Sequence, residues 1–312
     1  MQRIAIIDLG TNTFHLLVAD IGPSNVLVLH KEKQSVKIGA GGINHGKITK
    51  PAKKRALKTL NGFRETMTSM GVQSSYVTAT SAFRNASNGP SLADEIFKQT
   101  GLKVDIIDGQ QEATLIYQGV KQALDLGTSS SLIIDIGGGS VEFIIGNQEN
   151  VQWMHSFEIG AQRLMDQFHT HDPISHREIK SLESFLDRQL VSLASAMEQY
   201  NPKTLVGSSG TFDTLSHIHC LKQGLDKSDN PEQPLSVAGF KDIHKELVIK
   251  DRAERLKIPG MIEMRVDMIV VACCLIDYIL DRFTLPDIRV SSYALKEGAL
   301  FDVCAEVRAK LN

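Results

Sequence analysis

The chain has 312 residues, which at about 100–200 residues per domain predicts two domains, each long enough to bury a sizeable core. Its hydrophobic content of 42 % and charged content of 22 % are ordinary for a soluble globular protein. Lys and Arg (34) nearly balance Asp and Glu (36), so the net charge of −2 excludes a global basic field that would attract nucleic acid or membrane.

The termini and cysteines add little chemistry of their own. The four cysteines form no CxxC pair, and two of them lie within an apolar run, so we expect buried, reduced thiols. The opening MQRIAIIDLG does not match a signal peptide, and no apolar run reaches the ~18 residues of a membrane span. A cytoplasmic protein is therefore expected.

The first half of the chain alternates between strands and helices. Its strands are short, apolar and β-branched, and its first two helices start at Pro or a capping residue and end at Gly. Ser91 stands where it would cap one of these helices. The predicted strands are 3–8, 14–21, 25–38, 74–80 and 103–108, and the predicted helices are 49–71, 91–101 and 109–124.

The strand pattern then restarts at SSLIID, residues 130–135. One long helix is predicted over 175–200, followed by a strand at 204–207 and a loop at 223–236. Helices are expected at 240–248 and 261–283, and the segment from residue 287 again runs from a strand through a Ser/Gly turn into a helix.

The restart matches the start of the chain residue by residue. Residues 6–18 read IIDLGTNTFHLLV and residues 133–145 read IIDIGGGSVEFII, an offset of 127 that aligns the acids, the first glycines and the hydroxyls. Two unrelated hairpins are the alternative. We favour a duplication, which predicts similar α/β domains over 1–124 and 125–312 that face each other across a cleft.

Each copy places a glycine-containing turn between two apolar strands. Such turns expose successive backbone N–H groups, which bind anions and phosphate above all. A single turn of this kind is weak evidence, but two in matching frames could hold a chain of phosphates. The candidate phosphate-binding residues of the two turns are Gly10, Thr11, Asn12, Thr13, Gly137, Gly138, Gly139 and Ser140.

Acids beside the two turns suggest a cation. An aspartate next to bound phosphate repels it unless a cation intervenes, so Asp8 and Asp135 favour Mg²⁺, which prefers one or two carboxylates plus water and substrate oxygens. The alternative is that each aspartate only accepts hydrogen bonds from the turn after it. Glu142 interrupts the second apolar run, and strand alternation leaves it facing either the cleft or solvent.

Three further features have both a functional and a plain structural interpretation. Glu112 could orient or deprotonate water for attack on phosphorus, or simply favour a helix N-terminus. The loop containing Ser209, Gly210 and Thr211 could meet an anion or be an ordinary helix start. Arg84 could contact phosphate or be solvated. The spacing of His217, His219 and Cys220 fits no standard zinc site.

Six segments together resemble the exopolyphosphatase/guanosine pentaphosphate phosphatase family. They lie in the family's order over most of the chain: DLGTNTFHLLV, TSAFRNASNG, DGQQEATLIYQGV, DIGGGSVEFIIG, GSSGTFDTL and VSSYALKEGAL. The family belongs to the acetate-sugar kinase, heat-shock chaperone and actin superfamily. The resemblance implies an α/β fold of duplicated ribonuclease-H-like (actin-like) domains with the active site in the interdomain cleft.

The resemblance also implies an activity and roles for individual residues. The family uses Mg²⁺ to hydrolyse the terminal phosphoanhydride of inorganic polyphosphate or the 5′-phosphate of guanosine pentaphosphate. The match makes Glu112 the base or water-positioning residue and Arg84 a phosphate contact. It implies that Asp135 and Glu142 bind the metal or help to hold the water, which adds Glu142 to the metal ligands Asp8 and Asp135 suggested by the turns and gives it a catalytic role.

The chain departs from the family pattern in three places. Gln111 replaces the first glutamate of the family's Glu-Glu pair, and Thr13 replaces a serine. The chain ends soon after LKEGALFDVC, so it resembles the short two-domain form, in which a last helix at about 296–312 packs back on the first domain. The long forms' extended polyphosphate channel, and strong processivity with it, are in doubt.

Several alternatives stay open on the sequence alone. An ATP-dependent small-molecule kinase of the same superfamily would share the loops, and a non-catalytic nucleotide- or alarmone-binding regulator would share the cleft. Polyphosphate and guanosine pentaphosphate present the same terminal phosphate, so the sequence does not rank them. No nucleic-acid or membrane partner is expected. A homodimer remains one alternative, since dimers are the commonest closed assembly.

Overall fold

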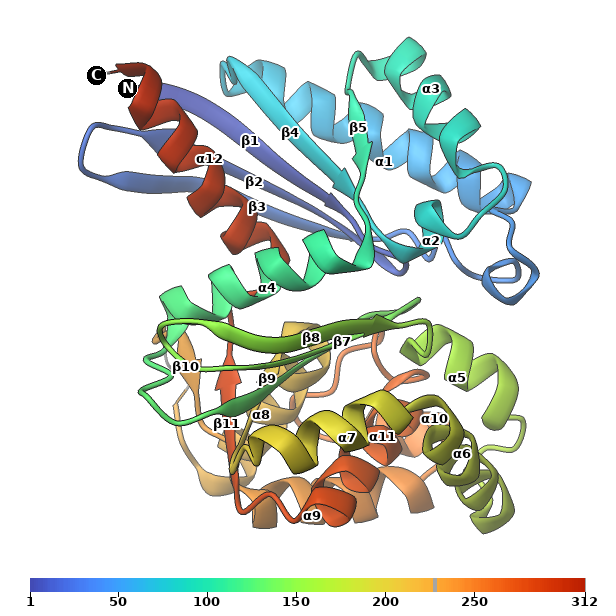
Figure 1. The fold of residues 1–312 in the computed structure, drawn as a ribbon. Coiled ribbons are helices and arrows are strands. Elements are labelled where there is room, and N and C mark those ends of the chain that lie inside the picture. The colour runs from blue at the N-terminus through green and yellow to red at the C-terminus, as the bar shows by residue number, and fades with distance from the viewer. Residues whose placement is uncertain (227–228, 312) are drawn as a thin grey trace. The chain divides into compact units, whose positions relative to one another are not determined.

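The structure is a computed structural model that describes residues 1–226 and 229–311 (Figure 1). Part of the loop predicted at 223–236 and the last residue of the predicted second domain lie outside the described residues. The chain divides into two compact units: unit 1 is Met1–Gly119 with Leu295–Asn312, and unit 2 is Val120–Ala294. The sequence placed a domain boundary after residue 124, and that boundary stays a prediction.

Unit 1 is built on a five-stranded sheet in the order β3-β2-β1-β4-β5. The first three strands form antiparallel neighbours, and β1, β4 and β5 run parallel. Because β1 is buried along most of its length, its apolar run is continuous instead of alternating. The strands are β1 (Gln2–Leu9), β2 (Thr13–Ile21), β3 (Val26–Ser35), β4 (Ser74–Ala79) and β5 (Val104–Ile106).

Helices cover both faces of this sheet. One face packs against α1 and α3, whose buried side chains include Leu60, Phe63 and Ile96. The other face packs against α12 through Leu300 and Val303, so the last helix belongs to unit 1 (Figure 1). The helices are η1 (Ile43–His45), α1 (Lys50–Ser69), α2 (Ser81–Arg84), α3 (Gly89–Thr100), α4 (Gly109–Ala123) and α12 (Leu295–Leu311).

Unit 2 repeats this topology in its own sheet, ordered β10-β11-β9-β6-β7-β8. Here β6, β7 and β8 are antiparallel neighbours, and β6, β9 and β11 run parallel, as β1, β4 and β5 do. The same fold in each unit confirms the predicted duplicated α/β architecture. The strands are β6 (Ser131–Ile136), β7 (Val141–Gly146), β8 (Val151–Phe157), β9 (Thr204–Ser208), β10 (Glu232–Gln233) and β11 (Asp287–Ser291).

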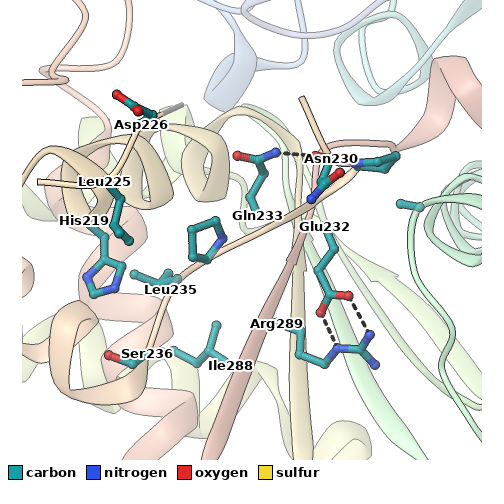
Figure 2. Close-up of a pocket in the computed structure, with 13 residues that line it drawn as sticks. His219, Leu225, Asp226, Asn230, Glu232, Gln233, Leu235, Ser236, Ile288 and Arg289 are labelled. Carbon is teal, nitrogen blue, oxygen red and sulfur yellow. Dashed lines mark hydrogen bonds and ion pairs between the residues drawn. The ribbon is translucent and has the colours of Figure 1, made fainter. Parts of the chain in front are cut away.

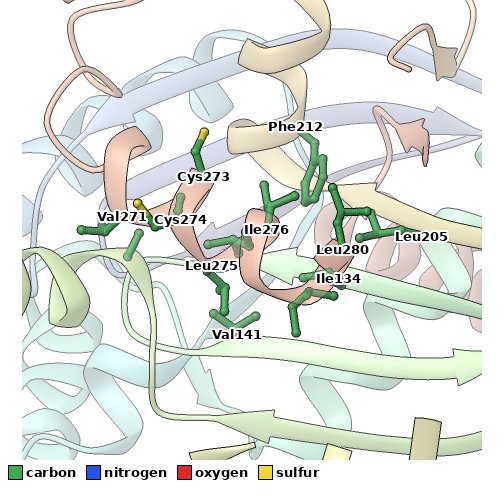
Figure 3. Close-up of a cluster of buried hydrophobic side chains, with 14 of the residues drawn as sticks. Ile134, Val141, Leu205, Phe212, Val271, Cys273, Cys274, Leu275, Ile276 and Leu280 are labelled. Atoms are coloured by element: carbon green, nitrogen blue, oxygen red, sulfur yellow. The ribbon is translucent and has the colours of Figure 1, made fainter. Parts of the chain in front are cut away.

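The core of unit 2 forms around α11, whose apolar side chains pack between helices and the sheet (Figure 3). Cys273 and Cys274 lie in this core, and all four cysteines are buried free thiols, as predicted. Burial raises the pKa of Cys274 to about 12. The helices are α5 (Ala161–Phe168), α6 (His176–Gln189), α7 (Val191–Tyr200), α8 (Ser209–Gln223), α9 (Val237–Ile249), α10 (Arg252–Arg255) and α11 (Ile269–Phe283).

Three details of the predicted helices are wrong. The helix predicted at 175–200 is two helices that change direction at Leu190, which turns into the core. Ser91 does not cap α3, which begins earlier and has Asn88 as its N-cap, because Pro90 occupies its first turn. The helix predicted from residue 261 starts at Ile269. None of the described helices combines the length and apolar character that crossing a bilayer requires.

Candidate functional site

The first glycine turn, Gly10–Asn12, joins β1 to β2 with its carbonyls turned toward the segment after β3. The N–H groups of Val36 and Lys37 donate to the carbonyl of Asn12, and that of Gly39 donates to Thr11. A trans peptide points its N–H opposite its C=O. The amides that follow these carbonyls therefore point away from that segment, which is the arrangement of an anion-binding turn.

A buried polar atom in this turn has no partner. The hydroxyl Oγ1 of Thr11 is buried and forms no hydrogen bond with any described residue. Thr11, Asn12 and Thr13 are all at least nine-tenths buried, and Asp8 pairs with His15 across the hairpin just before the turn. Since buried polar groups in folded proteins are nearly always satisfied, we expect the Thr11 hydroxyl to bind water or a ligand atom.

Arg84 and Glu112 form an ion pair in unit 1. Arg84 Nη1 donates to Glu112 Oε2 at 2.8 Å and to the carbonyl of Ile107 at 3.1 Å. Arg84 ends α2 directly after β4, and Glu112 lies in the first turn of α4. Their side chains are only 18 % and 9 % exposed, so the interpretation of Arg84 as a solvated residue is wrong.

The structure explains why glutamine can stand at position 111, where the resembled family has a glutamate. The amide oxygen of Gln111 accepts from the backbone N–H of Asp108, and the carboxylate of Asp108 accepts from the N–H of Gln111. This reciprocal pair is a capping box, in which glutamine and glutamate serve equally well. Gln111 therefore fixes the start of α4, and with it the position of Glu112 one residue later.

The second glycine turn, Gly137–Gly139, is held by the N-terminus of α5. The backbone N–H groups of Gly160, Ala161 and Gln162 donate to the three glycine carbonyls, and Arg163 Nε donates to that of Gly139 at 2.8 Å. As in the first turn, the following amides point away from this contact. A Cβ on Gly160 would lie 2.4 Å from backbone atoms of Gly138 and Gly139, so only glycine permits this approach.

Asp135 and Glu142 lie directly opposite each other on β6 and β7. Cross-strand partners share one face of a sheet, so both carboxylates are on the same side. Ser208 Oγ donates to Asp135 Oδ2 at 2.8 Å, and Ser156 Oγ donates to Glu142 Oε1 at 2.7 Å. Glu142 is 1 % exposed, so the alternative that its side chain faces solvent is wrong.

The third predicted loop enters α8 directly after β9. Ser209 has a φ of 72°, a left-handed conformation that a non-glycine residue rarely adopts and that often marks functional sites. The next residue, Gly210, lies so close to Arg265 that an added Cβ would be 2.0 Å from its Nη2 atom. Thr211, like Ser140 of the second turn, is buried.

Arg265 is a candidate residue that sequence reasoning missed. Burial lowers the pKa of its guanidinium, and the nearby carboxylates of Asp213 and Asp135 oppose that shift. Its Nε is buried and forms no hydrogen bond with a described residue. Ser208 and Ser156 were also missed. Ser208 lies beside the predicted loop, whereas no local sequence pattern identifies Ser156 or Arg265 as a functional residue.

The predicted residues thus form two half-sites, one within each unit. In unit 1 they are the first glycine turn, Asp8, Thr13, Arg84 and Glu112, and in unit 2 they are the second glycine turn, Asp135, Ser140, Glu142 and the loop at Ser209–Thr211. Across the described residues, no group of three or more His, Cys, Asp and Glu side chains could hold a metal ion.

A separate pocket of unit 2, with a volume of about 940 Å³, contains none of the predicted residues (Figure 2). Arg289 faces it, but Glu232 accepts from both Nε and Nη2 of that guanidinium, at 2.6 and 2.9 Å. Glu232 therefore already neutralises the charge of Arg289, and this guanidinium is not available to bind phosphate in the pocket.

Comparisons with known proteins point to one family. The model of the Ppx/GppA phosphatase family matches residues 17–306. The structure is similar to that of an exopolyphosphatase from Cytophaga hutchinsonii, with 44 % sequence identity, a TM-score of 0.94 and coverage of 98 % of both chains. The Aquifex aeolicus Ppx/GppA family member has the same fold, with 23 % identity, a TM-score of 0.78 and coverage of 100 % of this chain and 99 % of that one.

A longer protein also matches. The guanosine-5′-triphosphate,3′-diphosphate pyrophosphatase of Vibrio vulnificus is 27 % identical over 307 residues, which are 97 % of this chain. The match covers 60 % of that relative, so the chain spans well under two thirds of its length.

Proposed function

The chain belongs to the Ppx/GppA phosphatase family, and from this premise we propose that it hydrolyses terminal phosphoanhydride bonds and releases orthophosphate. The substrates proposed are inorganic polyphosphate and guanosine pentaphosphate. The observation that carries the proposal is the ion pair of Arg84 and Glu112, at 2.8 Å and largely buried. It places a carboxylate that can act on water beside a guanidinium that can bind phosphate.

Binding of phosphate is proposed for the two glycine turns. Their carbonyls are occupied by neighbouring segments, so the amide side of each turn is the side that meets an anion. Each half-site also contains a buried polar atom that forms no hydrogen bond among the described residues, Thr11 Oγ1 in unit 1 and Arg265 Nε in unit 2. A phosphate oxygen would satisfy either atom, which supports an anionic ligand over an apolar one.

The carboxylates fit Mg²⁺. Asp135 and Glu142 share one sheet face and are oriented by serine hydroxyls, which is the pattern of ligands held by a second layer of hydrogen bonds. Their oxygens suit a hard cation that takes one or two carboxylates, and Asp8 occupies the equivalent position in unit 1. A bound Mg²⁺ would offset the negative charge of the phosphates.

The proposed chemistry uses one water and no covalent intermediate. The water oxygen attacks the terminal phosphorus, and the bond from that phosphorus to the bridging oxygen breaks. The bridging oxygen is the leaving group and stays on the shortened chain. Glu112 orients the water and accepts its proton, while Arg84 binds an oxygen of the reacting phosphate. The hydrogen bond from Arg84 Nη1 also fixes the position of Glu112 Oε2.

Glu112→Gln tests the proposed base. We expect phosphate release to fall by about 10²–10⁴-fold, the usual contribution of general acid–base catalysis. Binding of polyphosphate should persist, since the amide keeps the shape of the side chain. Glu65→Gln, an exposed change on α1, is the matched control and should leave activity intact. Near-normal release by the Glu112 variant would contradict the assignment.

The preferred substrate is identified by comparing kcat/KM values. We expect phosphate release from long-chain polyphosphate, tripolyphosphate and guanosine pentaphosphate to differ in kcat/KM, and the highest value identifies the preferred substrate. Transfer of phosphate from ATP to a sugar, with no release from any of the three, would contradict hydrolysis and favour a kinase.

A further inference from the structure

A groove of unit 2 lies between the end of α5 and the exposed face of α6, away from the residues of the half-site. Its volume is about 550 Å³. The two helices pack side by side (Figure 1). The residues lining the groove are Phe168, His176, Arg177, Lys180, Ser181, Ser184 and Arg188.

The groove has a basic stripe at helical spacing. Arg177, Lys180 and Arg188 are exposed, and their positions, together with the serines at 181 and 184, recur every three or four residues along one face of α6. The distance from residue 177 to residue 188 corresponds to about 16 Å of helix. The stripe is therefore extended, and it offers several cations to one elongated partner.

These three cations are unpaired among the described residues. No hydrogen bond or ion pair joins the side chains of Arg177, Lys180 or Arg188 to a described group, whereas Arg252, Arg255 and Arg289 of the same unit each pair with an acid. Unpaired charges side by side repel one another, and a polyanion would relieve that repulsion.

Two of the three acids of α6 are held by other partners, and the third, Glu183, lies near Cys274 and Tyr278 of α11. Glu178 accepts hydrogen bonds from Ser175, Thr170 and His171. Asp187 accepts from Tyr278 at 2.7 Å and pairs with Arg282. Both acids thus face away from the groove into contacts within unit 2.

One helix connects the groove to the second glycine turn. The first residues of α5 donate to the carbonyls of Gly137–Gly139, and its last residue, Phe168, lines the groove. Eight residues of helix span about 12 Å. A chain held at the turn would have to extend over at least this length to reach the stripe, which a short oligophosphate does not do.

We propose that the α6 groove binds the body of an inorganic polyphosphate chain. This inference rests on the proposed function and deepens it, since it favours long polyphosphate over guanosine pentaphosphate. A nucleic acid fits less well, because single strands bind through aromatic rings that stack with bases. The phenyl ring lining the groove, that of Phe168, already packs against Phe185 with 5.1 Å between centroids.

The test compares two triple variants of the full chain. The first is Arg177→Gln, Lys180→Gln and Arg188→Gln. The matched control is Lys54→Gln, Lys58→Gln and Arg64→Gln, which removes the same charge from exposed positions on α1. Binding of fluorescently labelled long-chain polyphosphate is measured at several salt concentrations, and phosphate release is measured with long-chain polyphosphate and with tripolyphosphate.

We expect the groove variant to bind long-chain polyphosphate about tenfold or more weakly than wild type, with the slope of log Kd against log salt reduced by about 2. Its KM for the long chain should rise while its kinetics with tripolyphosphate stay unchanged. The α1 variant should match wild type throughout.

Three results would overturn the proposal: unchanged binding, equal losses in the two triple variants, or an equal loss with tripolyphosphate. Equal competition by a single-stranded RNA of similar charge would instead show an unspecific polyanion surface, and would also overturn it. The binding measurement needs no turnover. If wild type releases no phosphate from any substrate, the proposed function fails, and the groove is still judged by binding.

Discussion

Arg84 Nη1 lies 2.8 Å from Glu112 Oε2, although the two residues are 28 positions apart in the chain. The same nitrogen donates to the carbonyl of Ile107, so one guanidinium joins α2, the end of β5 and the first turn of α4. The candidate base is therefore oriented by a charge that also binds phosphate in the proposed function.

Arg84→Gln should lower kcat by about 10²-fold, because Glu112 loses the charge that orients it and phosphate loses a cationic donor. Steady-state phosphate release checks this value. Arg55→Gln, which removes a guanidinium bonded only to backbone carbonyls of Val36 and Lys37, is the control and should change kcat far less. Equal kcat values for the two variants would contradict a role for Arg84 at the site.

Ser208→Ala should raise the Mg²⁺ concentration needed for half-maximal activity by about tenfold or more. The change removes the hydrogen bond to Asp135 Oδ2, and residues that orient metal ligands typically contribute 10–100-fold to metal affinity. A Mg²⁺ titration of phosphate release measures the effect. Ser216→Ala, which loses a buried hydrogen bond to the carbonyl of Pro234, should leave the titration unchanged. The same shift in both variants would mean a general loss of structure.

Gly160→Ala should destabilise the fold by about 1–3 kcal/mol, the usual cost of forcing an extra carbon into a packed site. The new Cβ would lie 2.4 Å from backbone atoms of the second glycine turn, which cannot rotate out of the way. Gly62→Ala on α1 is the control, because no atom lies within 4 Å of its Cβ position. It should stabilise by about 0.5–1 kcal/mol through helix propensity. Urea unfolding measures both, and a neutral Gly160 variant would refute the close contact.

The pH dependence of stability should contain a contribution from Glu178. Burial raises its pKa, but hydrogen bonds from Ser175, Thr170 and His171 outweigh that effect, and the pKa lies well below the ordinary 4.5. A carboxylate with a lowered folded-state pKa stabilises the fold fully above its unfolded pKa, and that contribution is lost as the pH falls below it.

Glu178→Gln should therefore destabilise by about 1–3 kcal/mol at neutral pH, the range for hydrogen bonds to a charged group. The difference from wild type should shrink as the pH is lowered below 4.5. Urea unfolding at stepwise lower pH measures it. Glu183→Gln, an exposed change on the same helix, should show no such trend, and a constant difference for Glu178 across the series would contradict the argument.

How far the sequence predicted the site depended on whether the signal was local. The repeat at an offset of 127 predicted two matching strand-turn-strand units, and the structure pairs Asp8 with His15 as it pairs Asp135 with Glu142. Glycine turns and apolar strands are local features, so neighbouring residues are enough to identify them. The break at Leu190 is different, because core packing decides it and helix propensity on either side does not show it.

The sequence by itself determined the duplicated α/β fold, the two glycine turns and the acids beside them, because each follows from residues a few positions apart. Only the tertiary structure decided their partners: Arg84 for Glu112, Ser208 for Asp135, and Arg265 beside Gly210. It also decided that the cations of α6 have no acid opposite them among the described residues. The three pairs named above join segments 28 to 73 residues apart. Which side chains meet over such separations depends on how strands and helices pack.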